Sequence, residues 1–405
     1  MGKYDIIVIG AGAAGLMASI VASENGKKVL VFERNEKLGR KIRITGKGRC
    51  NVCNNCTADE FISHVPGNGK FMFSAINTFT PDDTMNFFEK LNVPLKTERG
   101  GRVFPVSDNA HDIADALANR ALKNGVIFQK STVDKIVYGE VKTVISNKIE
   151  YKADNILIAT GGASYKATGS TGDGYKFAKS LGHTVKEPRA SLVALTSDDK
   201  DCADMQGLSL RNCGLKLYLK NKCVFEDFGE MLFTHFGVSG PIVLSSSAHI
   251  RKDGDYYMNL DLKPALSVQQ LDNRLLRDFE SSSNRNFDNY LKELLPSKMI
   301  SVMINRVGIS GDTKCHSITR EQRHNLISNI KSFKINISGF RPINEAIITS
   351  GGVNIKEVNP KTMESKIAKG IYFAGEVIDV DAYTGGFNLQ IAFSTGYLAG
   401  ISMGE

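Results

Sequence analysis

The sequence lacks tryptophan, contains only ten prolines among 405 residues, and has no run of 18 consecutive apolar residues. Because a transmembrane helix needs about 20 predominantly apolar residues, we expect no membrane span. The chain starts at once with an apolar strand pattern at residues 4–9, which does not fit a secretory signal peptide. We therefore predict a cytoplasmic protein.

Cysteine is also scarce, since the seven residues are an odd number that favours reduced thiols over a disulfide framework. Three of them, Cys50, Cys53 and Cys56, have the spacing of the first three cysteines of a ferredoxin cluster. The fourth cysteine of such a cluster is missing, and a structural zinc site also needs a fourth ligand. We predict no metal here, and leave open whether these thiols have a redox or metal role.

The rest of the composition is that of an ordinary globular protein, with 42% apolar and 23% charged residues. The length suggests two or three domains of about 150 residues each. The 51 Lys and Arg residues exceed the 43 Asp and Glu residues, which gives a net charge of +8. This modest excess of positive charge suits an anionic cofactor or substrate. It is compatible with binding of nucleic acid but does not require it, and we consider nucleic acid an unlikely partner.

Glycine is enriched, and the first cluster of glycines follows the strand pattern at residues 4–9 as Gly10-x-Gly12-x-x-Gly15. In a dinucleotide-binding fold, the first glycine permits a tight turn, the second admits a pyrophosphate and the third allows close helix–strand packing. The N-terminus of the following helix then faces the phosphates. Glu33, at the end of the second strand pattern, is placed to accept hydrogen bonds from the adenosine ribose.

A second cluster combines glycine with positive charge. Arg34 indicates either a 2′-phosphate or a surface arginine near the adenine. The segment 39–51 packs five cations among three glycines, and its backbone can approach phosphates or an electron-rich ring. The alternative is a basic surface loop.

A third cluster lies near the carboxyl end, in the segments 375–379 and 385–390, each of which follows a strand pattern. The second of these segments opens a helix. A helix N-terminus aimed at the N1/O2 edge of a flavin would stabilise the reduced, anionic ring. Asp379 is a candidate for binding the ribityl chain, and the alternative is that Gly385-Gly386 is only a turn.

Hydrophobic patterning divides the chain into three parts. Residues 1–190 and 345–405 read as one discontinuous α/β domain, residues 191–264 and 332–344 as a β-rich subdomain, and residues 265–331 as a helical insert. Because both glycine-rich ends are α/β, the middle third reads as an insertion into the first domain.

Several individual elements are predicted from local signals. We expect a helix over 110–123, a buried strand at 126–128 and a turn at Asn221-Lys222. Capping boxes at Ser267 and Thr319 predict the starts of two helices.

These motifs resemble those of the BaiN/YhiN-type flavoproteins, also described as aminoacetone-oxidase-like FAD-binding enzymes. The matching segments are GAGAAG at 10–15, GRKIRITGKGRCN at 39–51, GGRVFPVSDNAHDI at 100–113, ATGGASY at 159–165, TGSTGDG at 168–174, MLFTHFGVSGPIVLSSS at 231–247, EAIITSGGV at 345–353 and GEVIDVDAYTGGFNLQIAFSTG at 375–396. They span nearly the whole chain in order. Cys53 and Cys56 depart from the small residues common in the family.

The resemblance implies an α/β fold, in which a Rossmann-like FAD-binding domain with a mixed sheet is interrupted by a β-barrel-like subdomain that carries the helical insert. It also implies non-covalent FAD, with residues 159–162 beside the pyrophosphate and Val133 by the adenine. The residues predicted to bind FAD are Gly10, Gly12, Ala13, Ala14, Gly15, Glu33, Arg34, Lys41, Thr45, Gly46, Gly48, Arg49, Cys50, Asn51, Val133, Thr160, Gly161, Gly162, Gly375, Glu376, Asp379, Gly386, Phe387, Asn388 and Leu389.

The predicted function is an FAD-dependent oxidoreductase that acts on a small organic molecule. No second GxGxxG is present, so NAD(P)H would bind transiently as a co-substrate. Our first hypothesis is the NAD(P)H-dependent reduction of an activated C=C bond. The alternatives are an FAD-dependent amine oxidase that produces hydrogen peroxide, and a flavin-containing RNA-binding or sensor protein.

Three residues are candidates for catalysis. Lys41 is expected near flavin N5, and His235 is a candidate proton donor in the segment 234–241, which could cover the flavin. Tyr383 is the third candidate. The sequence does not order these three, and it leaves the substrate and the oligomeric state open.

Overall fold

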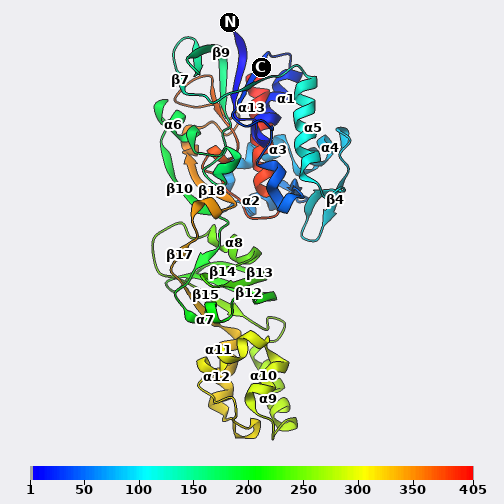
Figure 1. Ribbon diagram of the computed structural model, residues 1–405, viewed down its shortest axis with the longest axis vertical. Helices are drawn as coiled ribbons and strands as arrows, with labels where there is room; N and C mark the ends of the chain where they lie inside the picture. The colour runs from blue at the N-terminus through cyan, green and yellow to red at the C-terminus, as the bar shows by residue number, and fades with distance from the viewer. Residues whose placement is uncertain (1–2, 405) are drawn as a thin grey trace. The chain divides into compact units, whose positions relative to one another are not determined.

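The computed structural model describes residues 3–404, which form two compact units (Figure 1). Unit 1 consists of the residues up to Ser191 together with those from Pro342 onward, and unit 2 consists of Leu192–Arg341. The chain therefore leaves unit 1, builds unit 2 and returns.

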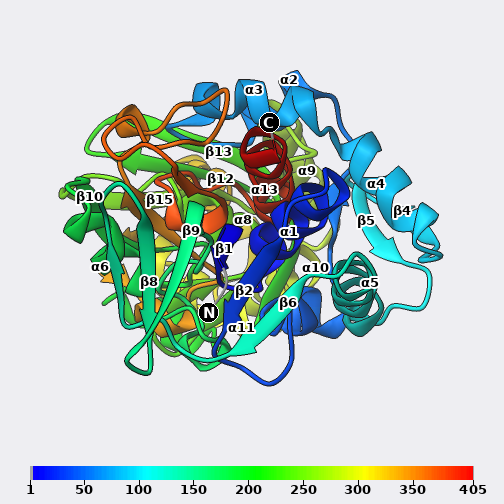
Figure 2. The ribbon, with the colours of Figure 1, turned by 90° about the horizontal axis from the view of Figure 1, so that it is seen from above.

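Unit 1 is built on a seven-stranded mixed sheet, of which β6, β2, β1, β9 and β8 are labelled in Figure 2. The order is β6 (Ile127–Lys130), β2 (Val29–Glu33), β1 (Tyr4–Ile9), β9 (Ile149–Ile158), β8 (Lys142–Ser146) and β7 (Lys135–Val137), with β19 (Ile371–Phe373) paired to β9. The pairs among β6, β2, β1, β9 and β19 are parallel, and those of β7, β8 and β9 are antiparallel. This arrangement is the Rossmann-type fold, and it brings the carboxyl ends of β1, β2 and β9 to one edge of the sheet.

The helices of unit 1 bring the two ends of the chain together. Helix α1 (Ala13–Glu24) packs against α13 (Phe387–Gly404), and the two lie side by side in Figure 2. A Cβ added to Gly396 of α13 would lie 2.4 Å from the carbonyl oxygen of Ala14, so the approach requires glycine. Helix α5 (Ala110–Lys123) covers the exact span expected from its periodicity and also packs on α1.

The predicted burial of strand 126–128 is wrong. Strand β6 pairs only with β2 and forms the edge of the sheet, and the side chain of Ile127 is 43% exposed. The apolar run was read as a strand buried on both faces, whereas an edge strand has a solvated side that local patterning does not reveal.

The remaining elements of unit 1 surround this sheet. A three-stranded sheet has the order β3 (Cys53–Asn54), β5 (Arg102–Pro105) and β4 (Leu95–Glu98), and a two-stranded sheet pairs β10 (Val185–Ser191) with β18 (Ile348–Val353). The other helices are α2 (Ala58–Ser63), α3 (Phe73–Thr78), α4 (Pro81–Lys90) and α6 (Asp173–Ser180).

Unit 2 contains a seven-stranded antiparallel sheet that closes like a barrel. Its order is β16 (Phe333–Ile337), β15 (Tyr256–Asp261), β12 (Ser209–Leu219), β13 (Lys222–Thr234), β14 (Gly237–Ser239), β11 (Leu195–Thr196) and β17 (Gly339–Phe340). The two end strands, β16 and β17, are separated by one residue in the chain, so a single stretch carries both ends of the sheet. The hairpin between β12 and β13 turns at residues 220–221, one residue earlier than predicted.

The helices of unit 2 are α7 (Lys200–Asp204), α8 (Pro241–Ser247), α9 (Val268–Ser281), α10 (Phe287–Leu294), α11 (Ser297–Val307) and α12 (Arg320–Lys331). The two capping boxes begin α9 and α12 as predicted, with reciprocal hydrogen bonds between Ser267 and Gln270 and between Thr319 and Gln322. Within residues 3–404, no helix has both the length and the apolar character needed to cross a membrane.

Candidate functional site: a pocket in unit 1

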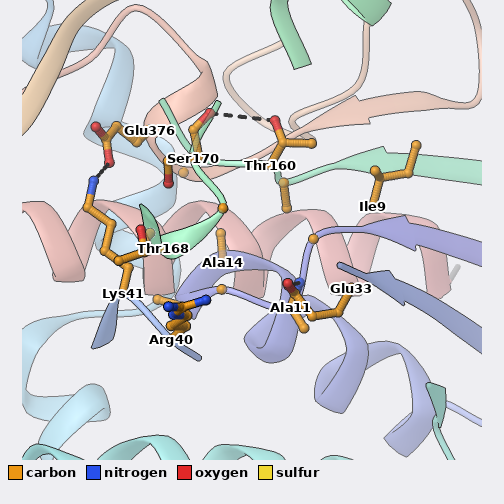
Figure 3. A pocket seen from close by; sticks show the side chains of 18 of the residues that line it. Ile9, Ala11, Ala14, Glu33, Arg40, Lys41, Thr160, Thr168, Ser170 and Glu376 are labelled. Atoms are coloured by element: carbon orange, nitrogen blue, oxygen red, sulfur yellow. Dashed lines mark hydrogen bonds and ion pairs between the residues drawn. The ribbon is translucent and has the colours of Figure 1, made fainter. Parts of the chain in front are cut away.

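A pocket opens at the carboxyl ends of β1, β2 and β9, entirely within unit 1 (Figure 3). Its walls come from residues far apart in the sequence. They are 9–14, 32–35, 40–42, Thr45, 131–133, 159–161, 168–171, Asp173, Phe177, 347–348, 374–376, Val380, 388–389 and 391–392. Ligands of open α/β sheets bind at this edge.

The first glycine cluster has the geometry that a pyrophosphate requires. Gly10 has a φ of +104°, and a Cβ there would lie 2.6 Å from the carbonyl oxygen of Ala159. A Cβ on Gly15 would lie 1.9 Å from the carbonyl oxygen of Gly10. A Cβ on Gly12 would meet nothing within 4 Å, although Gly12 lines the pocket. The space beside Gly12, at the N-terminus of α1, therefore fits a phosphate group.

Glu33 ends β2 at the pocket wall, where it is held in place by backbone groups. Its Oε2 accepts a hydrogen bond from the Ala11 N–H at 2.9 Å, and its Oε1 accepts from the Asn35 N–H at 2.8 Å. The carboxylate is thus oriented at the site where a ribose would hydrogen-bond.

Residues 168–173, which we call the strap, contribute to the pocket wall, and Arg34 anchors them. Arg34 pairs with Asp173 and donates a hydrogen bond to Thr171 Oγ1 at 3.0 Å. Burial raises the pKa of the Asp173 carboxyl, but hydrogen bonds from Thr171 and Arg34 outweigh it, and the pKa is lowered. Asn35 donates to the Thr168 carbonyl oxygen at 2.9 Å.

An ion pair stands at another part of the pocket wall. Lys41 Nζ lies 2.6 Å from Glu376 Oε2 and 2.9 Å from Ser164 Oγ, and Figure 3 shows the pair as a dashed line. The other carboxylate oxygen, Glu376 Oε1, accepts hydrogen bonds from the Thr349 N–H at 2.8 Å and from Ser164 at 3.0 Å. Glu376 is therefore fixed by three segments of unit 1, and it holds the ammonium group of Lys41 at the pocket.

The pocket contains fifteen of the residues predicted to bind FAD, namely Gly10, Gly12, Ala13, Ala14, Glu33, Arg34, Lys41, Thr45, Val133, Thr160, Gly161, Gly375, Glu376, Asn388 and Leu389. Ten others do not line it, namely Gly15, Gly46, Gly48, Arg49, Cys50, Asn51, Gly162, Asp379, Gly386 and Phe387. For these ten, contact with the cofactor stays a prediction.

Most of the basic segment turns away from the pocket. Arg49 pairs with Glu98 and Asp108, and its guanidinium lies 4.1 Å from the ring centroid of Phe104. The loop is shaped by left-handed residues, with φ values of +57° at Gly46 and +84° at Gly48. Arg49 therefore links this part of the loop to β4 and β5.

Two further predicted ligands are explained by contacts inside the protein. The carboxylate of Asp379 is 5% exposed, pairs with Lys186 at 2.5 Å and accepts a hydrogen bond from Asn68 at 2.9 Å. A Cβ on Gly386 would lie 2.3 Å from the carbonyl carbon of Cys53, so this glycine admits a close approach of the chain. Asn51 Oδ1 is buried without a hydrogen-bond partner among residues 3–404.

The other two catalytic candidates lie elsewhere. The backbone N–H of Tyr383 donates to the carbonyl oxygen of His64, and its ring contacts the His64 ring edge-on at 5.7 Å, outside the pocket lining. His235 is an exposed residue of unit 2, between β13 and β14. Their catalytic roles stay predictions.

Two of the three closely spaced cysteines lie in the interior, and the third, Cys56, is partly exposed. Cys50 and Cys53 are fully buried, and burial raises the pKa of Cys50 to about 12 and that of Cys56 to about 11. In the described part of the chain, no group of three His, Cys, Asp or Glu residues is arranged to hold a metal ion. The thiols are therefore protonated at neutral pH and poor nucleophiles.

Comparison with known proteins agrees with this site. The HI0933-like protein Rossmann domain matches residues 4–402. The ribosomal RNA dihydrouridine synthase of Haemophilus influenzae is 32% identical over 100% of this chain and 99% of its own. The 3-dehydro-bile acid delta(4,6)-reductase of Clostridium scindens is 30% identical over 98% of each chain. The 3-ketosteroid-delta4-(5alpha)-dehydrogenase of Rhodococcus jostii RHA1 shares the fold, with a TM-score of 0.55, 14% identity, and coverage of 100% of this chain and 97% of its own.

The fold and the pocket define an FAD-dependent oxidoreductase. The chain belongs to the HI0933-like family, as its match over nearly the whole length shows. The resemblance to BaiN-type flavoproteins is thereby confirmed.

Sequence reasoning missed several residues that build the site. Ser164 and Thr349 hold Glu376, and Asn35 and Thr168 hold the strap. Ser164, Thr168 and Thr349 lie in the segments 159–165, 168–174 and 345–353, whose family resemblance was the available signal, whereas no signal marked Asn35. Their roles could not be read locally, because each side chain acts on a partner from a different part of the chain.

Proposed function

We propose that this protein reduces a C=C bond conjugated to a carbonyl group, with NAD(P)H as the source of electrons. The observation that carries the proposal is the match over essentially the whole chain to two enzymes whose names both describe saturation of a ring C=C bond. One name describes the formation of dihydrouridine and the other a delta(4,6)-reductase. The two relatives differ in substrate but share the type of reaction. We therefore extend the type of reaction to this protein.

The residues of this chain would divide the work in a definite way. FAD, when bound, supplies the hydride chemistry. Gly12 and the N-terminus of α1 would receive its pyrophosphate, and Glu33 the hydroxyls of its adenosine ribose. Lys41, held by Glu376 and Ser164, would supply positive charge at the reacting end, where negative charge develops on the conjugated carbonyl side.

For the substrate we propose a uracil base in RNA, whose C5=C6 bond is conjugated to the C4 carbonyl. The relative from Haemophilus influenzae supports this choice, and so does the net charge of +8, which favours a polyanion. The sequence alone favoured a small molecule. The relative from Clostridium scindens keeps a small conjugated ketone as a second candidate.

Anaerobic stopped-flow spectroscopy of the purified holoenzyme tests the proposal. We expect NADPH or NADH to bleach the flavin, and ribosomal RNA lacking dihydrouridine to restore its colour while gaining two hydrogen atoms, as measured by mass spectrometry of the nucleosides. Recovery of colour with a steroid enone and not with RNA would favour the second candidate. Absence of bleaching by either nucleotide, with bleaching by an amine and release of hydrogen peroxide in air, would overturn the reductase proposal in favour of the amine oxidase.

A further inference from the structure

Two tyrosines on adjacent strands of unit 2 form a stack. Tyr218 of β12 and Tyr257 of β15 are register partners, with ring centroids 5.0 Å apart and ring planes at 6°. The ammonium group of Lys334, on β16, lies 4.5 Å from the centroid of the Tyr257 ring. Lys334, Tyr257 and Tyr218 thus form a ladder across three neighbouring strands, which we call the aromatic ladder.

The aromatic ladder stands on the outward face of the sheet. Side chains of a strand alternate between its two faces, and the neighbouring Leu217, Met258 and Ile335 are fully buried in the core. Tyr218 and Tyr257 are by contrast half-buried and Lys334 is exposed. A pair of large aromatic rings therefore stands on a surface where burial in the core does not require them.

One end of the aromatic ladder is open. The register partner of Tyr218 on the next strand, β13, is the small, exposed Cys223. Among residues 3–404, the only ring contact found for Tyr218 is the one with Tyr257. The outer face of the Tyr218 ring is therefore a platform on which a further flat ring can stack above Cys223.

The charges around this platform favour an anion. Lys220 and Lys222 lie at the exposed turn beside Tyr218, and within the described chain neither they nor Lys334 form an ion pair. Lys216 lies on the same face and is paired with Glu226 at 2.9 Å. Three lysines that form no ion pair within the described chain, Lys220, Lys222 and Lys334, therefore flank the aromatic ladder.

We propose that the aromatic ladder binds single-stranded RNA, with one base stacked on Tyr218 and the phosphates near Lys220, Lys222 and Lys334. Proteins hold single-stranded nucleic acid by combining aromatic platforms with cations that follow the backbone, and both are present here. The inference rests on the proposed RNA substrate and adds a second contact site for that RNA, formed by residues of unit 2 alone. A cross-strand pair that only stabilises the sheet is the competing explanation.

The first experiment measures binding of a fluorescein-labelled oligouridylate to the holoenzyme by fluorescence anisotropy at fixed salt. We expect Tyr218→Ala to raise the dissociation constant about five- to 150-fold, as the loss of one stacked base predicts. Tyr218→Phe should retain the affinity, because it keeps the ring. Tyr138→Ala, which removes a 47% exposed tyrosine of unit 1, is the matched control and should have no effect.

Lysine variants and thermal unfolding separate binding from sheet stability. Lys334→Ala should weaken binding and reduce the slope of log K against log salt by about one. Affinity unchanged in Tyr218→Ala, or lost only in parallel with the melting temperature, would overturn the proposal. So would the absence of oligouridylate binding by the wild-type holoenzyme.

Cys223 supplies an independent footprint. Bound oligouridylate should protect Cys223 from a maleimide in the wild-type holoenzyme and not in Tyr218→Ala, whereas unchanged labelling in both would contradict the proposal. NADPH-driven bleaching of the flavin is measured in the same samples. If the holoenzyme shows no RNA binding at the aromatic ladder but its flavin is bleached by NADPH and it reduces an enone, only the proposal for the aromatic ladder is refuted. If NADPH does not bleach the flavin of the wild-type holoenzyme, the reductase proposal is refuted.

Discussion

Lys41 and Glu376 are 335 positions apart in the sequence, yet their charged atoms lie 2.6 Å apart at the wall of the FAD pocket. The side chains are 24% and 13% exposed, so the pair is largely shielded from water. An ion pair in such a position holds the two ends of unit 1 together and fixes a positive charge at the wall of the pocket. It connects the basic segment of the N-terminal half with the strand end after β19.

Replacement of Lys41 by methionine removes this charge at nearly constant volume. We expect the rate of C=C reduction to fall about 100-fold, because a fixed electrostatic partner of the reaction is lost. The unfolding free energy should fall by about 1–3 kcal/mol, since Glu376 loses its partner. Single-turnover reduction and urea denaturation measure the two effects.

The matched variants for this prediction are Lys41→Arg and Glu376→Gln. Arginine keeps the charge and should retain much of the rate. Glutamine keeps an oxygen for the Thr349 N–H and for Ser164, but loses the ion pair. A Lys41→Met enzyme with an unchanged rate would remove Lys41 from the reacting end of the pocket.

A glycine-to-alanine substitution should weaken FAD binding at one position, Gly12, and destabilise the fold at another, Gly15. Gly12→Ala places a Cβ in open space within the pocket, at a φ of −82° that alanine tolerates. FAD binding should therefore weaken by about 1–3 kcal/mol while the stability of the apoprotein is retained. Gly15→Ala places its Cβ 1.9 Å from the Gly10 carbonyl oxygen and should instead destabilise the fold.

Isothermal titration with FAD and thermal unfolding of the apoprotein distinguish these outcomes. If Gly12→Ala bound FAD with wild-type affinity, the space beside Gly12 would not be the pyrophosphate site. If Gly15→Ala were as stable as the wild type, the helix would have to shift away from the turn.

Unit 2 should lose stability in mild acid because of His249. Burial, aided by the nearby charge of Arg251, lowers the pKa of His249 from 6.5 to about 4, against a hydrogen bond with the Val224 backbone. Between these two pH values, His249 therefore binds a proton in the unfolded state but not in the folded state. The contribution of His249 to the free energy of unfolding is fully present above pH 6.5 and is lost as the pH falls from 6.5 toward about 4.

Amide hydrogen exchange of unit 2 peptides, followed from neutral pH downward and corrected for intrinsic exchange rates, measures this dependence. His249→Gln should flatten it, whereas His324→Gln, at a side chain that is 50% exposed, should leave it unchanged. An equally steep dependence in His249→Gln would assign the acid sensitivity to another group.

The cysteines should react in an order set by burial. In the folded protein, iodoacetamide should label the exposed Cys223 and spare Cys50, whose pKa burial raises to about 12. All seven should react in denaturant. Mass spectrometry of the labelled peptides gives the order, and rapid labelling of Cys50 in the folded state would restore a redox role for this cluster.

Local sequence signals were reliable where the residues that determine an element all lie within that short segment. The helix at Ala110–Lys123 follows from one apolar face, and the capping boxes at Ser267 and Thr319 follow from residues three positions apart. Strand 126–128 was misjudged because the number of its neighbours is a property of the sheet. Binding of the ribityl chain by Asp379 stays a prediction, but local signals could not reveal that its carboxylate meets Lys186, almost 200 residues away in the chain.

The sequence by itself predicted a dinucleotide cofactor, because Gly10-x-Gly12-x-x-Gly15 and Glu33 encode a turn, a helix start and an acid within one continuous stretch, and the family resemblance narrowed this to FAD. Only the tertiary structure decided that Lys41 meets Glu376, that Arg34 fastens the strap at Asp173, and that Tyr218 stacks on Tyr257. The physical reason is that side-chain pairs across large sequence separations depend on how strands and helices pack. Periodicity and spacing specify those elements one at a time, and do not specify their partners.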